Sequence, residues 1–231
     1  MLPFTVCPVG DTGLLVSFEQ RIAQSVGAAV AALNTRVAAA AIPGVVETVP
    51  AFASLLIFYD PLVTEYDAVA DAVQKLAQAP GSDTAAEEGR LVEIPVCYGG
   101  TFGPDLPFVA EHAGLTEKEV MELHTGREYR IYMLGFLPGF PYLGGLDERL
   151  FTPRLASPRT AIPAGSVGIG GEQTGVYPIA SPGGWQLIGR TPLKLFDPSA
   201  GRLPYAAGDR IRFCPITQDE FDAIAQKEGT V

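Results

Sequence analysis

The sequence of 231 residues predicts an α+β protein built from two units of unequal size. Strand-like and helical runs alternate over the first third of the chain. A polar, acidic stretch then interrupts the apolar pattern, and the remainder consists mainly of short strand-like runs between glycine- and proline-rich turns. With 47% hydrophobic and 18% charged residues, the chain has enough apolar material for a packed core.

Strands and helices alternate in the first unit. The pattern predicts strands over residues 4–9, 14–18, 45–49 and 54–59, and helices over residues 20–41 and 65–78. We expect Thr64 to be the N-cap of the second helix, and Pro–Gly pairs to end both helices. This order of elements predicts a small unit with a split, ferredoxin-like arrangement.

A polar segment separates the two units. Residues 79–90 are small, polar and acidic and have no apolar period, which is typical of a linker. We therefore expect an N-terminal α+β domain over residues 1–85 and a second domain over residues 86–231.

The second unit is predicted to be mainly β. A strand over residues 91–98 precedes a helical stretch at 105–113 and a helix that a capping box of Thr116 and Glu119 opens and that ends near His124. The later strands are expected over residues 129–134, 166–169, 175–179, 185–190 and 210–214. A closing helix over residues 219–227 starts from Thr217. Many short strands with dense turn chemistry favour a β-barrel or a sandwich.

Charge and cysteine content exclude several classes of protein. A net charge of −10, from 16 basic and 26 acidic residues, argues against a nucleic-acid partner and gives no reason to expect binding to an anionic membrane. Neither an export signal nor a membrane segment is indicated. The odd number and wide spacing of Cys7, Cys97 and Cys214 predict reduced, buried thiols in a cytoplasmic protein.

Common catalytic motifs are absent or incomplete. Ser166 lies in a near match to the Gly-x-Ser-x-Gly elbow, but both histidines, His112 and His124, precede it, so we interpret Ser166 as a turn or site-wall hydroxyl. No metal-ligand spacing and no phosphate-binding loop occurs. The glycines of residues 165–171 form either a tight turn or an amide nest for an anion. His124 either contacts the helix C-terminus or belongs to a site.

Glycine and proline are concentrated between Gly135 and Gly189, at roughly twice their density elsewhere, which predicts rigid loops around a site. Polar and aromatic residues on these loops are candidates for the wall of a pocket or subunit interface, although each arginine alone could be a surface residue. No catalytic residue is assigned. The candidates are Gly139, Phe140, Tyr142, Arg154, Arg159, Ser166, Gln173, Thr174, Trp185, Gln186 and Arg190.

Four long motifs, in order along the chain, resemble the family of 5-oxoprolinase B subunits, also called allophanate hydrolase subunit 1. They span residues 132–146, 153–159, 162–178 and 181–192. Further landmarks lie at residues 10–16, 43–46 and 91–100, so the resemblance covers nearly the whole chain without a motif-level departure.

The resemblance implies a small α+β domain followed by a cyclophilin-like β-barrel. It further implies a chain that works with a C subunit and an A subunit to couple ATP hydrolysis to opening of the 5-oxoproline lactam, with ATP used by the assembled complex. The family also includes a bacterial inhibitor of the sporulation histidine kinase, so a kinase-binding role is the alternative. A role related to allophanate hydrolase or urea carboxylase is a further variant. The likeness to a cyclophilin barrel also suggests prolyl isomerase activity, but fold alone does not convey function.

Overall fold

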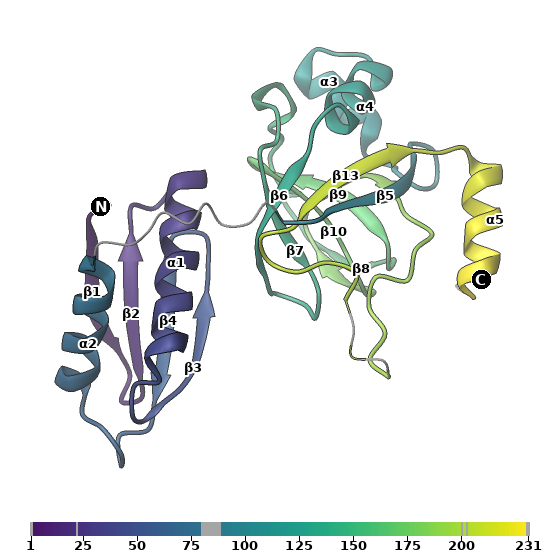
Figure 1. The fold of residues 1–231 in the computed structure, drawn as a ribbon. Helices are drawn as coiled ribbons and strands as arrows, with labels where there is room; N and C mark the ends of the chain where they lie inside the picture. Colours follow the sequence, from purple (N-terminus) through teal and green to yellow (C-terminus); the bar gives the residue numbers. More distant parts are fainter. Residues whose placement is uncertain (1, 22, 80–88, 200, 202, 230–231) are drawn as a thin grey trace. The chain divides into compact units, whose positions relative to one another are not determined.

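The computed structural model describes residues 2–21, 23–79, 89–199, 201 and 203–229 (Figure 1). The chain divides into two compact units, Met1–Glu87 and Glu88–Val231. Most of the predicted linker, residues 80–88, lies outside the described residues.

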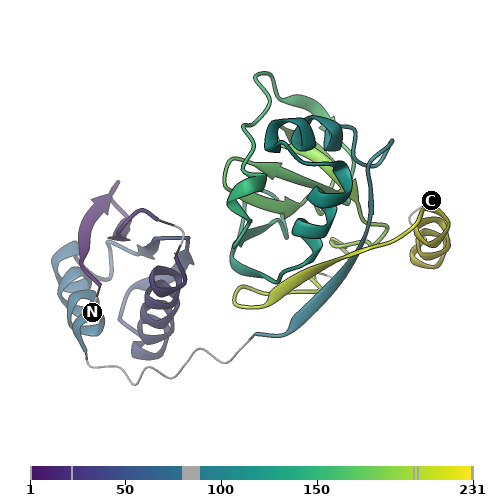
Figure 2. The same ribbon diagram turned by 90° about the horizontal axis from the view of Figure 1, so that it is seen from above.

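The first unit is a four-stranded antiparallel sheet with two helices. Its strands are β1 (Phe4–Val9), β2 (Gly13–Phe18), β3 (Val45–Pro50) and β4 (Ser54–Tyr59), in the order β1-β2-β4-β3. Helices α1 (Gln24–Ala40) and α2 (Tyr66–Gln78) pack on one face of the sheet (Figures 1 and 2). Their apolar faces and the inward side chains of β2 and β4 form the core, which includes Leu14, Val16, Val30, Leu33, Leu55, Ile57 and Val73.

All four strands predicted for this unit are confirmed, and two details are corrected. The expected N-cap Thr64 is wrong: α2 is preceded by Glu65 in extended conformation, because the Thr64 amide donates to Asp60 O in the turn after β4. The order of elements is ββαββα, whereas a ferredoxin-like unit runs βαββαβ. The mixed α and β character of the unit is therefore confirmed, but its expected ferredoxin-like order is not found.

The second unit is a closed barrel of seven strands, which decides between the barrel and the sandwich. Around the barrel the order is β10-β7-β6-β13-β5-β12-β9, and β13 pairs with β5 in parallel. The strands are β5 (Leu91–Tyr98), β6 (Tyr129–Leu134), β7 (Pro141–Gly144), β9 (Ser166–Gly170), β10 (Gln173–Val176), β12 (Gln186–Arg190) and β13 (Arg210–Pro215). A two-stranded sheet of β8 (Arg159–Ile162) and β11 (Ser181–Gly183) accompanies them.

Among the described residues of the second unit, three helices and one 3₁₀ turn accompany the strands. Helices α3 (Leu106–Ala113) and α4 (Glu117–Thr125) cover one end of the barrel, as Figure 1 shows, and η1 (Glu148–Leu150) contacts both helices. Helix α5 (Gln218–Glu228) follows β13. Both α4 and α5 begin with a capping box, in which a threonine hydroxyl and a glutamate carboxylate satisfy the first amides. The predicted capping box of Thr116 and Glu119 is thus confirmed, as is the start of α5 at Thr217.

The predicted state of the cysteines is only partly right. All three are free, but only Cys97 is buried, whereas Cys214 is half-buried and Cys7 is exposed. Cys7 is exposed because it lies on the face of β1 that points away from α1 and α2. Among the described helices, none has both the length and the apolar character needed to cross a membrane.

Candidate functional site

The loop between β6 and β7 begins with a strained turn. The Leu137 amide donates to Gly135 O at 2.6 Å, which closes a three-residue turn around Phe136. Phe136 has a φ of 62°, a left-handed value that a bulky residue rarely adopts. The Gly135 amide donates to Phe140 O at 3.1 Å and closes the loop at its base.

A second turn follows directly. The Phe140 amide donates to Leu137 O at 3.0 Å across Pro138 and Gly139, and Gly139 has a φ of 82°. Proline followed by a left-handed glycine at the two central positions is the pattern of a type II turn. The Tyr205 hydroxyl donates to Gly139 O at 2.9 Å, so the loop is also fixed by a side chain that lies 66 residues further along the chain. The predicted rigidity of this glycine–proline segment thus has a specific hydrogen-bonded basis.

Aromatic side chains meet behind this loop. The buried ring of Phe140 lies 5.2 Å from Tyr142, 5.3 Å from Tyr177 and 5.5 Å from Trp185, each in an edge-to-face arrangement. Such pairs add about 0.5–1.5 kcal/mol beyond the burial of their area. We call Phe140, Tyr142, Tyr177 and Trp185 the aromatic cluster. Burial raises the pKa of Tyr177 to about 12, so its hydroxyl is protonated at neutral pH.

Glycines make room for the indole of Trp185. A Cβ on Gly170 would lie 2.5 Å from Cδ1 of Trp185, and a Cβ on Gly175 would lie 3.1 Å from Cζ3 of the same ring. The amides of Gly165 and Gly171 already donate to Tyr177 O and Thr152 O, so these two glycines are not available for an amide nest. Gly165 and Gly171, both at positive φ, are turn residues whose amides donate to backbone carbonyls, and Gly170 is part of strand β9.

The predicted arginines and Gln186 have different surroundings. The guanidinium of the exposed Arg154 lies 5.8 Å from the centre of the Trp185 ring, a cation–π arrangement. The half-buried Arg159 donates to the carboxylate of Asp105 at 2.7 Å. Arg190 Nε donates to Ala164 O at 3.0 Å, and Gln186 Nε2 donates to Pro153 O at 2.9 Å.

Asp105 is not among the residues that the sequence singled out, yet it connects three elements, α3, β8 and β12. One carboxylate oxygen accepts from Arg159 of β8, and the other accepts from the Leu187 amide of β12 at 2.6 Å. Asp105 itself directly precedes α3. The guanidinium of Arg159 is therefore already paired with the carboxylate of Asp105 within the chain.

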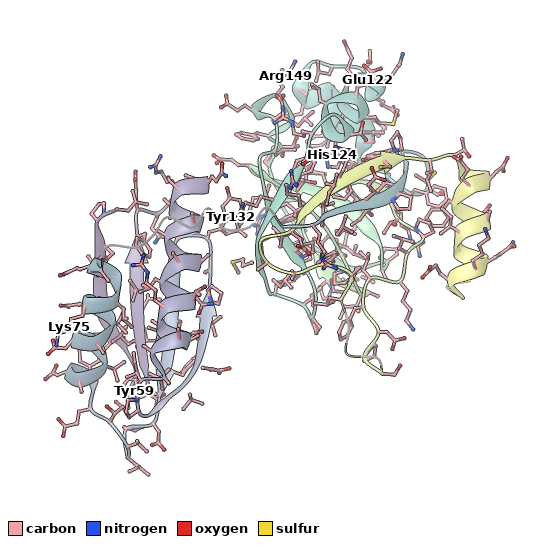
Figure 3. All side chains as sticks on the ribbon, viewed as in Figure 1. Tyr59, Lys75, Glu122, His124, Tyr132 and Arg149 are labelled. Atoms are coloured by element: carbon pink, nitrogen blue, oxygen red, sulfur yellow. The ribbon has the colours of Figure 1, made fainter. Side chains whose placement is uncertain are left out.

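Thr174, the second residue of β10, lies in the interior of the barrel unit. Its hydroxyl donates to Gly168 O at 3.0 Å and therefore accepts from His124 Nε2 at 2.8 Å. The imidazole must then be protonated at Nε2, so Nδ1 accepts from the Tyr98 hydroxyl at 2.8 Å. Both Thr174 and His124 are fully buried, and Figure 3 shows His124 inside the second unit. Burial lowers the pKa of His124 to about 3, so the ring is neutral.

The remaining predicted residues occupy barrel strands. Ser166 is buried at the start of β9, opposite Arg190 on β12, and a second strand follows β9, so the strand–turn–helix setting of a nucleophile elbow is absent there. The half-buried Gln173 pairs with Gly170, on which the indole packs. Among the described residues, no group of three or more His, Cys, Asp or Glu side chains could hold a metal ion.

A hollow of about 550 Å³ opens elsewhere on the second unit. It lies between the end of β5 and the start of α5, and its walls include Tyr98, Phe102, Met121 and Ile216. No local sequence pattern predicts this hollow, because the two segments that form it are far apart along the chain.

The barrel with its preceding α/β unit defines a carboxyltransferase domain of the subdomain C and D type: that family model matches residues 4–205. The chain is 43% identical to the 5-oxoprolinase B subunit of Bacillus subtilis (strain 168), with 96% of each chain covered. It is 50% identical to the 5-oxoprolinase B subunit of Escherichia coli O157:H7, with 81% of each covered. The chain therefore belongs to the family of 5-oxoprolinase B subunits, which confirms the resemblance of its four motifs.

A more distant relative shares the fold. The crystal structure of Kluyveromyces lactis urea carboxylase superposes with a TM-score of 0.82 at 21% identity. The match covers 98% of this chain and 23% of that chain.

Proposed function

We propose that the chain is the B subunit of an ATP-dependent 5-oxoprolinase and is inactive alone. In this proposal it acts in the cytoplasm with a C subunit and an A subunit to open the 5-oxoproline lactam and form glutamate. The observation that carries the proposal is the identity of 43–50% to 5-oxoprolinase B subunits over most of the chain. The rigid loops and the aromatic cluster of the second unit support a binding role.

The chemistry needs groups that hold anions. A lactam carbonyl is a poor electrophile, and ATP would supply a phosphoryl group that makes the lactam oxygen a better leaving group. The substrate also carries a carboxylate. Guanidinium groups recognise carboxylates well, and a guanidinium that stacks on an aromatic ring is held in place for that contact.

Arg154 is the residue of this chain that fits the substrate carboxylate best. It is exposed, it lies over Trp185, and within the described part of the chain it forms no ion pair. Arg159 is already paired with Asp105, so we assign it a positioning role. We assign Gln173, whose strand partner is the glycine on which the indole packs, to the lactam amide. We also assign Gly139, Phe140, Tyr142 and Trp185 to the wall of this proposed site.

A reconstituted mixture of the three subunits tests this proposal. The complete mixture should form glutamate from 5-oxoproline only when ATP is present. Arg154→Gln should raise KM for 5-oxoproline by roughly tenfold or more, the cost of about 1.4 kcal/mol for a lost charged contact. Lys118→Gln on α4 makes the same charge change at an exposed site and should leave KM unchanged. Absence of turnover in the complete mixture would refute the proposed function.

Two structural assignments accompany the functional one. Moving the last strand of a βαββαβ unit to its beginning gives the order ββαββα, so we assign the first unit to a permuted ferredoxin-like arrangement. The closed seven-stranded barrel fits the cyclophilin-like domain that the family resemblance implies.

A further inference from the structure

Phe136 combines exposure with backbone strain. Its side chain is 64% exposed at the tip of the loop between β6 and β7, and its φ is 62°. A left-handed conformation is costly for a residue with a Cβ, and glycine would adopt it without that cost. Within the chain, little burial of the ring offsets the strain.

The loop nevertheless holds the ring in one place. Hydrogen bonds close the turn around Phe136 and the base of the loop, and the adjoining type II turn is fixed by the Tyr205 hydroxyl. The ring of Phe136 meets Phe140 edge to face at 5.8 Å between centroids. An aromatic side chain presented on a rigid loop loses little conformational entropy when it binds.

The residues that this segment exposes, Phe136, Pro138 and Gly145, are all uncharged. Residues 131–146 contain no charged side chain, although the tip of their loop is at the surface. Leu137 and Pro138, which follow Phe136, are half-buried and exposed respectively. Depletion of charge and enrichment in aromatic residues mark the centre of protein–protein interfaces, where a few buried aromatic anchors dominate the affinity.

We propose that Phe136 is the anchor by which this chain docks onto the C subunit of its assembly, with the phenyl ring filling an apolar pocket of that subunit. This inference rests on the proposed function, which makes the chain one subunit of a complex. The strain at Phe136 is retained because the ring is buried only in the complex. Strained backbone residues cluster at functional sites, so an observed outlier of this kind supports a functional role for Phe136.

Two substitutions separate the ring from the backbone. Phe136→Ala and Phe136→Gly both remove the ring, but only glycine relieves the strained φ. We expect both variants to bind the purified C subunit roughly 30-fold more weakly than the unmodified chain, as for an interface hot spot of about 2 kcal/mol. Phe136→Gly should unfold at a higher temperature than Phe136→Ala. The control is Phe108→Ala on α3, another exposed aromatic, which should bind normally.

Calorimetric titration of the C subunit with each variant gives the affinities, and thermal unfolding of the free chains gives the stabilities. Binding of Phe136→Gly within threefold of the unmodified chain overturns the proposal. Normal binding with lost turnover also overturns it, because the ring would then face the substrate. If the unmodified chain binds the C subunit with an affinity that needs Phe136, but the three subunits form no glutamate, the docking role stands and the proposed function fails.

Discussion

The hydroxyl of Thr174 bridges a buried histidine and a strand carbonyl, so its removal should destabilise the barrel without changing side-chain shape. Valine replaces the hydroxyl by a methyl group in Thr174→Val. The imidazole of His124 then loses its partner at Nε2, 2.8 Å away, and Gly168 O loses a donor at 3.0 Å. Whichever tautomer the ring adopts, one of its nitrogens faces the new methyl group.

The expected cost follows from burial. Thr174 and His124 are 0% exposed, so water cannot replace the lost contact in the native structure. An unsatisfied buried polar group costs about 1–3 kcal/mol. For a unit of this size, each kcal/mol lowers the melting temperature by about 2–4 °C.

Trp185 makes the assay specific for the barrel unit, because it is the one tryptophan of the chain. Urea unfolding followed by its fluorescence therefore reports the second unit alone. Thr160→Val, on the exposed side of β8, is the matched control and should change the unfolding free energy by less than about 0.5 kcal/mol. Equal stability of the two variants would refute the bridging role of the hydroxyl.

Three further outcomes are expected. Because burial lowers the pKa of His124 to about 3, the unfolded chain binds one more proton than the folded chain between about pH 6.5 and pH 3. The free energy of unfolding in urea should therefore fall by up to about 1.4 kcal/mol per pH unit as the pH drops through this range. His124→Gln should remove this contribution. Gly170→Ala should cost about 1–3 kcal/mol and shift the emission of Trp185, because the new Cβ would lie 2.5 Å from the indole; an unchanged spectrum and stability would contradict the packing. A double-mutant cycle of Asp105→Ala and Arg159→Ala should give a coupling of about 1 kcal/mol, and strictly additive effects would show that the ion pair contributes nothing.

Local signals predicted much of the fold. The capping box of Thr116 and Glu119 that opens α4 lies in four consecutive residues and is predicted from the sequence, whereas for α5 only the start at Thr217 is predicted and not its capping box. Strands β7, β8 and β11 were missed because they have only three or four residues, and β7 and β11 contain proline or glycine. β7 pairs with β6 and β10 of the barrel, and β8 and β11 pair with each other, so each short strand depends on a distant partner that a local pattern cannot show.

The candidate site was predictable only in part. The high density of glycine and proline predicts the loop between β6 and β7 and the aromatic cluster. The loop needs a glycine at positive φ, and the indole of Trp185 packs where glycines leave room for it. The partners of Arg159 and Thr174 could not be read, because Asp105 is 54 residues away and His124 is 50 residues away along the chain. Phe136 lay within a recognised motif, but its positive φ has no sequence signature in a residue other than glycine.

The central claim is that this chain is a required subunit of a 5-oxoprolinase. Its most direct test is a titration of the chain into fixed amounts of the A and C subunits, with ATP and 5-oxoproline in excess, while glutamate is measured. We expect no glutamate without the chain and a rate that rises with added chain to a plateau at a fixed ratio to the other subunits. Glutamate formation at the same rate with and without the chain would contradict the claim.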